Sequence, residues 1–233
     1  MSAPVAQLNE VFNSIQGEGL YVGLRQTFIR FASCNLSCQY CDTDFVAKQS
    51  ATVDELLTIV QSFDKPKGVN HSIAITGGEP LLQVDFLKEF LPKLKEQTGL
   101  PVYLETNGTL PDHLQEVIEL VDIIALDFKL PSATGESAYW KEHKKSLEIA
   151  FMKEAFVKIV FTSETMAKEM MEAVRFIAEV DDNIPLILQP VTPHGPIKHR
   201  PLAEQIFAFH NIAKRQLKNV RVIPQTHKLL RLN

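Results

Sequence analysis

Strand-like and helical segments alternate along most of the 233-residue chain, and this order constrains the fold more than any other feature. Short aliphatic, aromatic and β-branched runs are separated by stretches with the period of amphipathic helices. Alternation of this kind predicts parallel strands joined by right-handed crossovers. The predicted strands are residues 26–32, 72–76, 102–106, 123–128, 156–162 and 185–188. We expect an α/β fold, a partial TIM-type barrel with parallel strands.

Three of the helical segments carry an apolar stripe along one face. Thr52 and Glu55 have the spacing of a capping box, which marks the start of the first segment. We expect all three stripes to be buried. Their members are Val53, Leu56, Leu57, Val60 and Phe63, then Met166, Met170, Val174 and Ile177, then Leu202, Ile206, Phe209, Ala213 and Leu217.

Composition indicates an ordinary soluble enzyme, which we expect to form a single domain over residues 1–233. Hydrophobic residues make up 45% of the chain, enough for one core at this length. The net charge of −4 argues against a broad surface for nucleic-acid phosphates. Apolar runs such as 123–126 are too short to cross a bilayer, and residues 1–10 lack a secretory signal pattern. The expected protein is cytoplasmic, with neither a nucleic-acid nor a membrane partner.

All three cysteines of the chain, Cys34, Cys38 and Cys41, follow the first predicted strand. Three thiolates in a short loop can hold three corners of a 4Fe-4S cluster and leave the fourth iron open. A structural zinc is a weaker alternative, because it needs a fourth ligand and the nearest histidine, His71, has no Cys or His pair beside it. A disulfide would leave one thiol over and close a very short loop. An iron–sulfur centre with an open iron is therefore predicted, in a reducing compartment.

Polar turns follow the next three predicted strands, at the end where parallel barrels carry their active sites. They are Thr-Gly-Gly-Glu-Pro at 76–80, Glu-Thr-Asn-Gly at 105–108 and Asp-Phe-Lys at 127–129. Glycines at the first turn either let the backbone approach a ligand or form a tight turn. Asp127 and Lys129 share a strand face, so they either contact a ligand or form a strand-end ion pair.

The cysteine spacing is similar to that of the radical S-adenosylmethionine enzymes, and Gly-Gly-Glu-Pro at 77–80 resembles their cofactor-binding turn. In that superfamily, the amino and carboxylate groups of S-adenosylmethionine bind the open iron. The resemblance implies a 4Fe-4S cluster and S-adenosylmethionine as cofactors, and chemistry by a 5′-deoxyadenosyl radical.

Further motifs narrow the resemblance, over nearly the whole chain, to the family of 7-carboxy-7-deazaguanine synthases. They are Phe-Asn-Ser-Ile-Gln-Gly-Glu-Gly at 12–19, Phe-Ile-Arg at 28–30, Cys-Asp-Thr at 41–43 and Gln-Thr-His-Lys at 225–228. The resemblance implies conversion of 6-carboxy-5,6,7,8-tetrahydropterin to 7-carboxy-7-deazaguanine with loss of ammonia, a step towards queuosine and other deazapurines. It also implies a homodimer, a magnesium ion, and an external electron donor such as flavodoxin.

The resemblance also implies roles for individual residues. Cys34, Cys38 and Cys41 would hold the cluster, and the Thr43 hydroxyl would bind magnesium, which accepts few protein ligands. A guanidinium suits the substrate carboxylate. The residues expected to bind substrate are Ile15, Gln16, Gly17, Glu18, Arg30 and Thr76. Those expected to bind S-adenosylmethionine are Tyr40, Asp42, Gly78, Glu105, Asp127, Phe128 and Lys129.

The motif at 127–129 departs from the family, which commonly has serine two residues before the lysine. Asp127-Phe-Lys129 looks more like the glycyl-radical activating enzymes of the same superfamily, which act on a protein backbone glycine. A glycyl-radical activase is therefore an alternative function. A non-catalytic metal-binding module is a third.

Overall fold

The computed structural model describes residues 4–232, which form one sheet of nine strands. The strand order is β3-β1-β2-β4-β5-β6-β7-β8-β9. From β2 to β9 all neighbours are parallel, whereas β1 pairs antiparallel with both β2 and β3. The bounds are β1 Ala6–Ile15, β2 Arg25–Phe31, β3 Gln49–Ala51, β4 Ser72–Gly77, β5 Val102–Thr106, β6 Ile123–Asp127, β7 Glu154–Phe161, β8 Leu186–Pro190 and β9 Val220–Val222.

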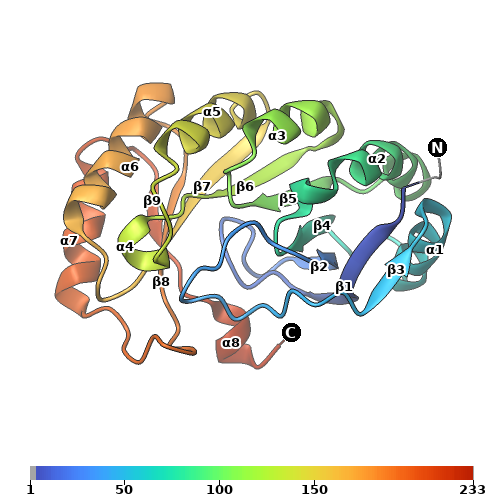
Figure 1. Cartoon of the computed structure of the whole chain (residues 1–233), viewed down its shortest axis with the longest axis horizontal. Coiled ribbons are helices and arrows are strands. Elements are labelled where there is room, and N and C mark those ends of the chain that lie inside the picture. Colours follow the sequence, from blue (N-terminus) through green and yellow to red (C-terminus); the bar gives the residue numbers. More distant parts are fainter. Residues whose placement is uncertain (1–3, 233) are drawn as a thin grey trace.

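Helices follow the outer side of the curved sheet, and most of them connect one parallel strand to the next (Figure 1). Their bounds are α1 Val53–Phe63, α2 Val84–Thr98, α3 Pro111–Val117, α4 Pro131–Thr134, α5 Trp140–Ala150, α6 Ala167–Val180, α7 Ala203–Lys214 and α8 Thr226–Leu230, with short 3-10 helices η1 Pro80–Gln83 and η2 Ile118–Leu120. The sheet is open, with β3 and β9 at its two edges. The predicted partial barrel with parallel strands is confirmed.

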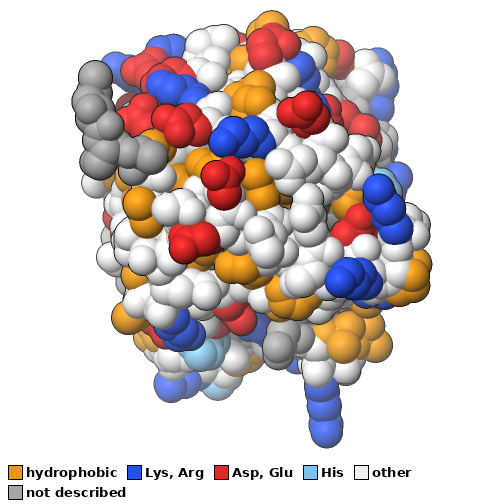
Figure 2. All heavy atoms as spheres, turned by 90° about the vertical axis from the view of Figure 1, so that its right-hand side faces the viewer, with side chains coloured by type: hydrophobic (Ala, Val, Ile, Leu, Met, Phe, Trp, Pro, Cys, Tyr) orange, Lys and Arg blue, Asp and Glu red, His pale blue; other side chains and the backbone are white. Residues whose placement is uncertain are grey.

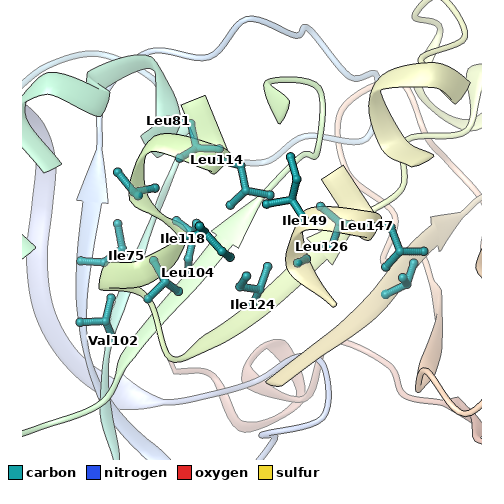
Figure 3. Close-up of a cluster of buried hydrophobic side chains, with 14 of the residues drawn as sticks. Ile75, Leu81, Val102, Leu104, Leu114, Ile118, Ile124, Leu126, Leu147 and Ile149 are labelled. Carbon is teal, nitrogen blue, oxygen red and sulfur yellow. The ribbon is translucent and has the colours of Figure 1, made fainter. Parts of the chain in front are cut away.

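The strands alternate their side chains between two hydrophobic layers. The larger layer lies between the sheet and the helices, and Figure 3 shows part of it, where Leu104 and Ile124 from the strands meet Leu114 and Leu147 from the helices. The smaller layer covers the inner face of the sheet and consists of Phe28, Ala74, Tyr103, Ile123, Ala125, Phe156 and Ile187.

The same alternation places the site. Because side chains repeat on one face every second residue, the inner face that carries Ala74, Tyr103 and Ala125 continues to Thr76, Glu105 and Asp127. On β7 it continues from Phe156 to Lys158, and on β8 from Ile187 to Gln189. The inner side of the sheet is therefore apolar at one end and polar at the carboxyl ends of the strands.

All six predicted strands are present, shifted by at most two residues at either end. The capping box at α1 is also confirmed, since Glu55 N donates to Thr52 Oγ1 and Thr52 N donates to Glu55 Oε2. Two members of the predicted core stripes are wrong. Met166 is 43% exposed and Leu202 is 71% exposed, because each is the capping residue just before its helix rather than part of the buried face.

Charged side chains of both signs are interspersed over the molecular face that carries the α1 and β3 edge of the sheet (Figure 2). Within residues 4–232, no helix is long and apolar enough to span a bilayer.

Candidate active site

One pocket opens at the carboxyl ends of the parallel strands, and it brings together almost every predicted site residue. Its walls include the cysteine loop, the turn after β1, the ends of β4 to β8 and the C-terminal segment before α8. Of the predicted residues, all line this pocket except Phe128. The assigned roles remain predictions, but the residues that carry them share one cavity.

The cysteines lie in the long loop between β2 and β3 and are half-buried with free thiols. Cys41 N donates to Cys38 O at 3.0 Å, so a tight turn joins the last two. Asn107 Nδ2 lies 3.9 Å from Cys34 Sγ. Burial raises the pKa of the Cys34 thiol, and that of Cys38 to about 11, so metal binding by these thiols would release their protons.

The donor set fits a cluster. Three free thiols line one pocket, and a 4Fe-4S cluster takes each thiolate on a separate iron. A structural zinc takes four protein ligands, whereas the loop supplies three cysteines.

Gly77, the last residue of β4, and Gly78, which follows it, both lie against the backbone of another segment of the chain. A Cβ added at Gly78 would overlap the backbone carbonyl of Ser33, and one at Gly77 would overlap the backbone of Phe31. Gly78 N donates to Phe31 O at 3.1 Å, and Glu79 N donates to Ser33 O at 2.9 Å. The segment that approaches these glycines closely is therefore the start of the cysteine loop, which contacts this turn through Phe31 and Ser33.

Glu79 of the same turn is fully buried and joins two turns of the site. Its carboxylate accepts hydrogen bonds from Leu81 N at 3.1 Å, Thr106 Oγ1 at 2.9 Å and Asn107 N at 2.7 Å. Burial raises its pKa to about 7, against the opposing effect of these donors. Glu79 thus fixes the turn after β5, from which Asn107 reaches Cys34.

On the side of the pocket near β1, Glu18 lies between a lysine and an amide. Lys158 Nζ donates to Glu18 Oε2 at 2.5 Å, and Gln225 Nε2 donates to Glu18 Oε1 at 2.8 Å. Burial alone would raise the pKa of Glu18, but the Lys158 ammonium and the hydrogen bonds hold it well below its usual range. Glu18 is therefore a carboxylate that stays ionised and can accept from a ligand.

The C-terminal segment closes this side of the pocket. Thr226 N and Thr226 Oγ1 both donate to Gly17 O, at 2.9 and 3.0 Å. Lys228 forms an ion pair with Asp42, the residue next to Cys41. The motif at 225–228 therefore joins the turn after β1 to the cysteine loop. The C-terminal Asn233 lies outside the described residues.

The side-chain amide of Gln16, which we expected to contact substrate, is hydrogen-bonded to other residues of the chain. Its Nε2 donates to Gln26 Oε1 at 3.0 Å and to Glu105 Oε1 at 2.9 Å, and its Oε1 accepts from Glu18 N. Glu105 Oε2 also accepts from Thr76 Oγ1 at 2.8 Å. Glu105, which we expected beside S-adenosylmethionine, thus contacts two residues that we expected beside the substrate.

Arg30 lines the pocket and is anchored on one side. Its Nη1 lies 2.6 Å from Glu10 Oε1, and its guanidinium stands 5.1 Å from the centre of the Phe12 ring. Arg30 therefore forms an ion pair with Glu10. Glu10 holds the guanidinium at the pocket wall, where it can still receive a carboxylate through its remaining N–H groups.

At the end of β6, Asp127 and Lys129 point to the same face of the strand, as expected. Lys129 Nζ lies 2.8 Å from Asp127 Oδ2 and donates to Tyr40 Oη at 3.3 Å. The strand-end ion pair is thus formed, and both of its members also line the pocket. Phe128 points the other way, into the outer core, where it stacks on the buried His143 ring at 4.7 Å. A side-chain contact between Phe128 and the cofactor is not supported by this arrangement.

Sequence reasoning missed two polar residues of the pocket wall, Lys158 and Gln189. Gln189 is buried, and its amide helps to lower the pKa of Glu18. A signal was available, because Lys158 interrupts the apolar run Phe156-Val-Lys-Ile-Val-Phe161 at an inward position. A lysine at an interior strand position needs a charged partner.

Comparison with known proteins agrees with this site. Residues 28–151 match the family model of the radical SAM superfamily. The solved structure of QueE from Escherichia coli superposes with a TM-score of 0.62 and 18% sequence identity, over 94% of this chain and 93% of that one. Streptococcus suis SuiB superposes with a TM-score of 0.59 and 18% identity, over 82% of this chain and 47% of that one. The partial barrel and the cysteine loop thus define a radical S-adenosylmethionine enzyme, with a 4Fe-4S cluster and S-adenosylmethionine as its cofactors.

Curated relatives give the finer class. The 7-carboxy-7-deazaguanine synthase of Geobacter sulfurreducens is 45% identical, over 99% of each chain. The protein of the same name from Methanothermobacter thermautotrophicus is 34% identical, over 100% of this chain and 98% of the relative. The chain belongs to the 7-carboxy-7-deazaguanine synthase family.

Proposed function

We propose that the protein converts 6-carboxy-5,6,7,8-tetrahydropterin to 7-carboxy-7-deazaguanine with release of ammonia, in the biosynthesis of queuosine or related deazapurines. The observation that carries this proposal is the set of residues that line the pocket. Three free cysteines, the turn at Gly17 and Glu18, and Arg30 all line it. The curated relatives favour this reaction over the activation of a glycyl-radical enzyme.

The residues of the pocket divide into two groups. Cys34, Cys38 and Cys41 would hold the cluster, and Tyr40, Asp42, Gly78, Asp127 and Lys129 surround the adjoining space for S-adenosylmethionine. When bound, these cofactors supply the organic radical that takes a hydrogen atom from the substrate. The chain itself positions the reacting carbon and keeps water out.

The second group would recognise the pterin. Arg30 would pair with the substrate carboxylate, since a guanidinium matches a carboxylate in shape and charge. The Glu18 and Glu105 carboxylates would accept from the N–H groups of the pterin edge. Thr43 would bind magnesium through its hydroxyl, and the ion would also take the substrate carboxylate and waters.

We also propose the organisation and setting of the enzyme. The chain would be a single domain, because the cysteine loop and the C-terminal Gln225 contribute to one pocket. A homodimer is supported by the apolar side chains of Leu229 and Leu230 on α8, which are more than half exposed. An external electron donor such as flavodoxin and a cytoplasmic location follow from the need to reduce the cluster and keep it reduced.

The test is anaerobic reconstitution with iron and sulfide, followed by an absorption spectrum and a turnover assay. With S-adenosylmethionine, a reductant and 6-carboxy-5,6,7,8-tetrahydropterin, we expect 7-carboxy-7-deazaguanine and ammonia in equal amounts. Cys38→Ala should abolish cleavage of S-adenosylmethionine while leaving the circular dichroism spectrum unchanged. Cleavage at the wild-type rate by that variant would overturn the cluster assignment.

The same experiment separates the alternatives. An activase would show the cluster spectrum and cleave S-adenosylmethionine but leave the pterin unchanged. A metal-binding module would show no iron–sulfur absorption after reconstitution.

A further inference from the structure

Four charged side chains form a continuous chain along the wall of the pocket. Lys158 Nζ lies 2.5 Å from Glu18 Oε2 and 3.4 Å from Asp127 Oδ2. Lys129 Nζ lies 2.8 Å from that same Asp127 oxygen. The charges alternate in sign, and no member of the chain is more than 20% exposed at its side chain. Lys158 is therefore shared between two carboxylates.

These two carboxylates belong to different parts of the site. Glu18 is bound by Gln225 and lies beside the turn that we assign to the substrate. Asp127 is bound by Lys129, whose ammonium reaches Tyr40 in the cysteine loop. Lys158 is thus the direct link between the substrate side and the cofactor side of the pocket.

The position of Lys158 would suit an apolar residue if only the fold were at stake. Phe156 and Val160, two residues before and after it, point to the same inner face and line the pocket. Burying an ammonium among such neighbours is costly unless carboxylates and hydrogen bonds compensate it. Although burial lowers the pKa of Lys158, Glu18 and Asp127 raise it well above its ordinary value, so the residue stays charged.

Asp127 retains an acceptor for a ligand. Its Oδ2 is held by the two lysines, while its Oδ1 is buried and has no hydrogen-bond partner within residues 4–232. A buried carboxylate oxygen without a partner is rare in proteins. A hydroxyl group of a bound cofactor would satisfy it.

We propose that Lys158 is a positioning residue that couples the two sides of the pocket through Glu18 and Asp127. The inference rests on the proposed function, which assigns substrate to one side and S-adenosylmethionine to the other. A ligand that engages Glu18 weakens the hold of that carboxylate on Lys158, and the ammonium then draws closer to Asp127. Because linkage is reciprocal, each ligand changes the affinity for the other.

The test measures the dissociation constant of S-adenosylmethionine by equilibrium dialysis on anaerobically reconstituted protein. Glu18→Gln changes the substrate side only, yet it should shift this constant about fivefold or more when Lys158 is present. In the Lys158→Met background, the same change at Glu18 should leave the constant unaltered. Lys158→Arg keeps the charge and should restore the dependence.

Controls separate coupling from general damage. Lys153→Met removes a lysine at the surface whose ammonium lies 3.1 Å from Glu119, and it should leave the dependence intact. Thermal unfolding followed by circular dichroism checks that each variant folds. If Lys158→Met does not fold, Lys158→Gln, which keeps a hydrogen-bonding side chain, gives the same comparison.

An equal effect of Glu18→Gln with and without Lys158, or no effect in either, would overturn the proposal. Wild-type protein that binds S-adenosylmethionine but not 6-carboxy-5,6,7,8-tetrahydropterin would instead overturn the proposed function. The two failures are therefore distinguishable.

Discussion

Gly78 rests directly against the backbone of Ser33, the residue that precedes the first cysteine. A methyl group at position 78 would overlap the Ser33 carbonyl and press on the Cβ of Cys34. Glu79 N donates to the same carbonyl at 2.9 Å. The turn after β4 thus packs against the start of the cysteine loop. The position of Cys34 therefore depends on Gly78, which is distant from it in sequence.

Gly78→Ala should therefore displace the start of the cysteine loop and lower the iron content after reconstitution. The overlapping atoms belong to backbone, which cannot rotate away as a side chain would. The measurement is iron and sulfide per chain, with the absorption of the cluster.

The matched control for this change is Gly99→Ala. Gly99 has a positive φ of 67° but open space around its Cβ position, so alanine there should cost about 1 kcal/mol in stability and leave cluster content unchanged. Equal iron content in the Gly78→Ala and wild-type proteins would contradict the supporting role of Gly78.

Arg30→Ala should reduce the affinity for the pterin by about 2–5 kcal/mol, because the substrate carboxylate would lose its charged partner. Affinity for S-adenosylmethionine should change little. Isothermal titration with each ligand measures both effects. Glu10→Gln removes the charge beside Arg30 but keeps an oxygen that can accept from the guanidinium, so it should leave pterin binding largely intact. Equal pterin affinities for wild type and Arg30→Ala would reject the assignment.

Thr43→Val should lower turnover and flatten its dependence on magnesium, because valine keeps the shape of threonine and lacks the oxygen that a hard cation needs. Thr43→Ser keeps the oxygen and should retain the magnesium response. Initial rates against magnesium concentration decide the matter. If valine and threonine give the same curve, the ion is bound elsewhere.

Glu79 should make the protein less stable as pH rises. Its pKa is raised from 4.5 to about 7 in the folded state, so the folded protein holds a proton that the unfolded chain releases. The free energy of unfolding should fall by about 3 kcal/mol between pH 4.5 and 7 from this group alone. Urea unfolding across this range isolates the group as a difference: the free energy of unfolding of wild type minus that of Glu79→Gln should fall by this amount as pH rises. Parallel curves would contradict it.

His143 should act in the opposite direction. Burial lowers its pKa from 6.5 to about 4, and its Nε2 lies 3.1 Å from Asn107 O. The unfolded chain therefore binds a proton that the folded protein does not, and stability should fall by about 3 kcal/mol as pH drops from 6.5 to 4. The free energy of unfolding of wild type minus that of His143→Gln should fall by this amount over the same pH range. A variant with the wild-type acid dependence would show that His143 is not the group responsible.

Local sequence was enough to predict six of the seven parallel strands within residues 4–232, since β2, β4, β5, β6, β7 and β8 are dense runs of β-branched, aromatic and aliphatic residues. It missed the three-residue edge strand β9, which is parallel to β8. It also missed β1, because Ala6–Ile15 is mostly half-buried and carries Asn9, Glu10 and Asn13 among its apolar residues. Its antiparallel place in the sheet depends on pairing with β2 and β3, which no local pattern records.

The sequence by itself determined the cysteine triad, the residues that end each parallel strand and the family to which they point, because these depend on residue type and spacing. Only the tertiary structure decided how these residues meet. In the folded chain, Phe128 is buried in the core. The Gln16 amide donates to Glu105 and Gln26. Lys158 lies between Glu18 and Asp127. These contacts join residues distant in the chain, and they follow from the register and curvature of the assembled sheet, which a single strand does not specify.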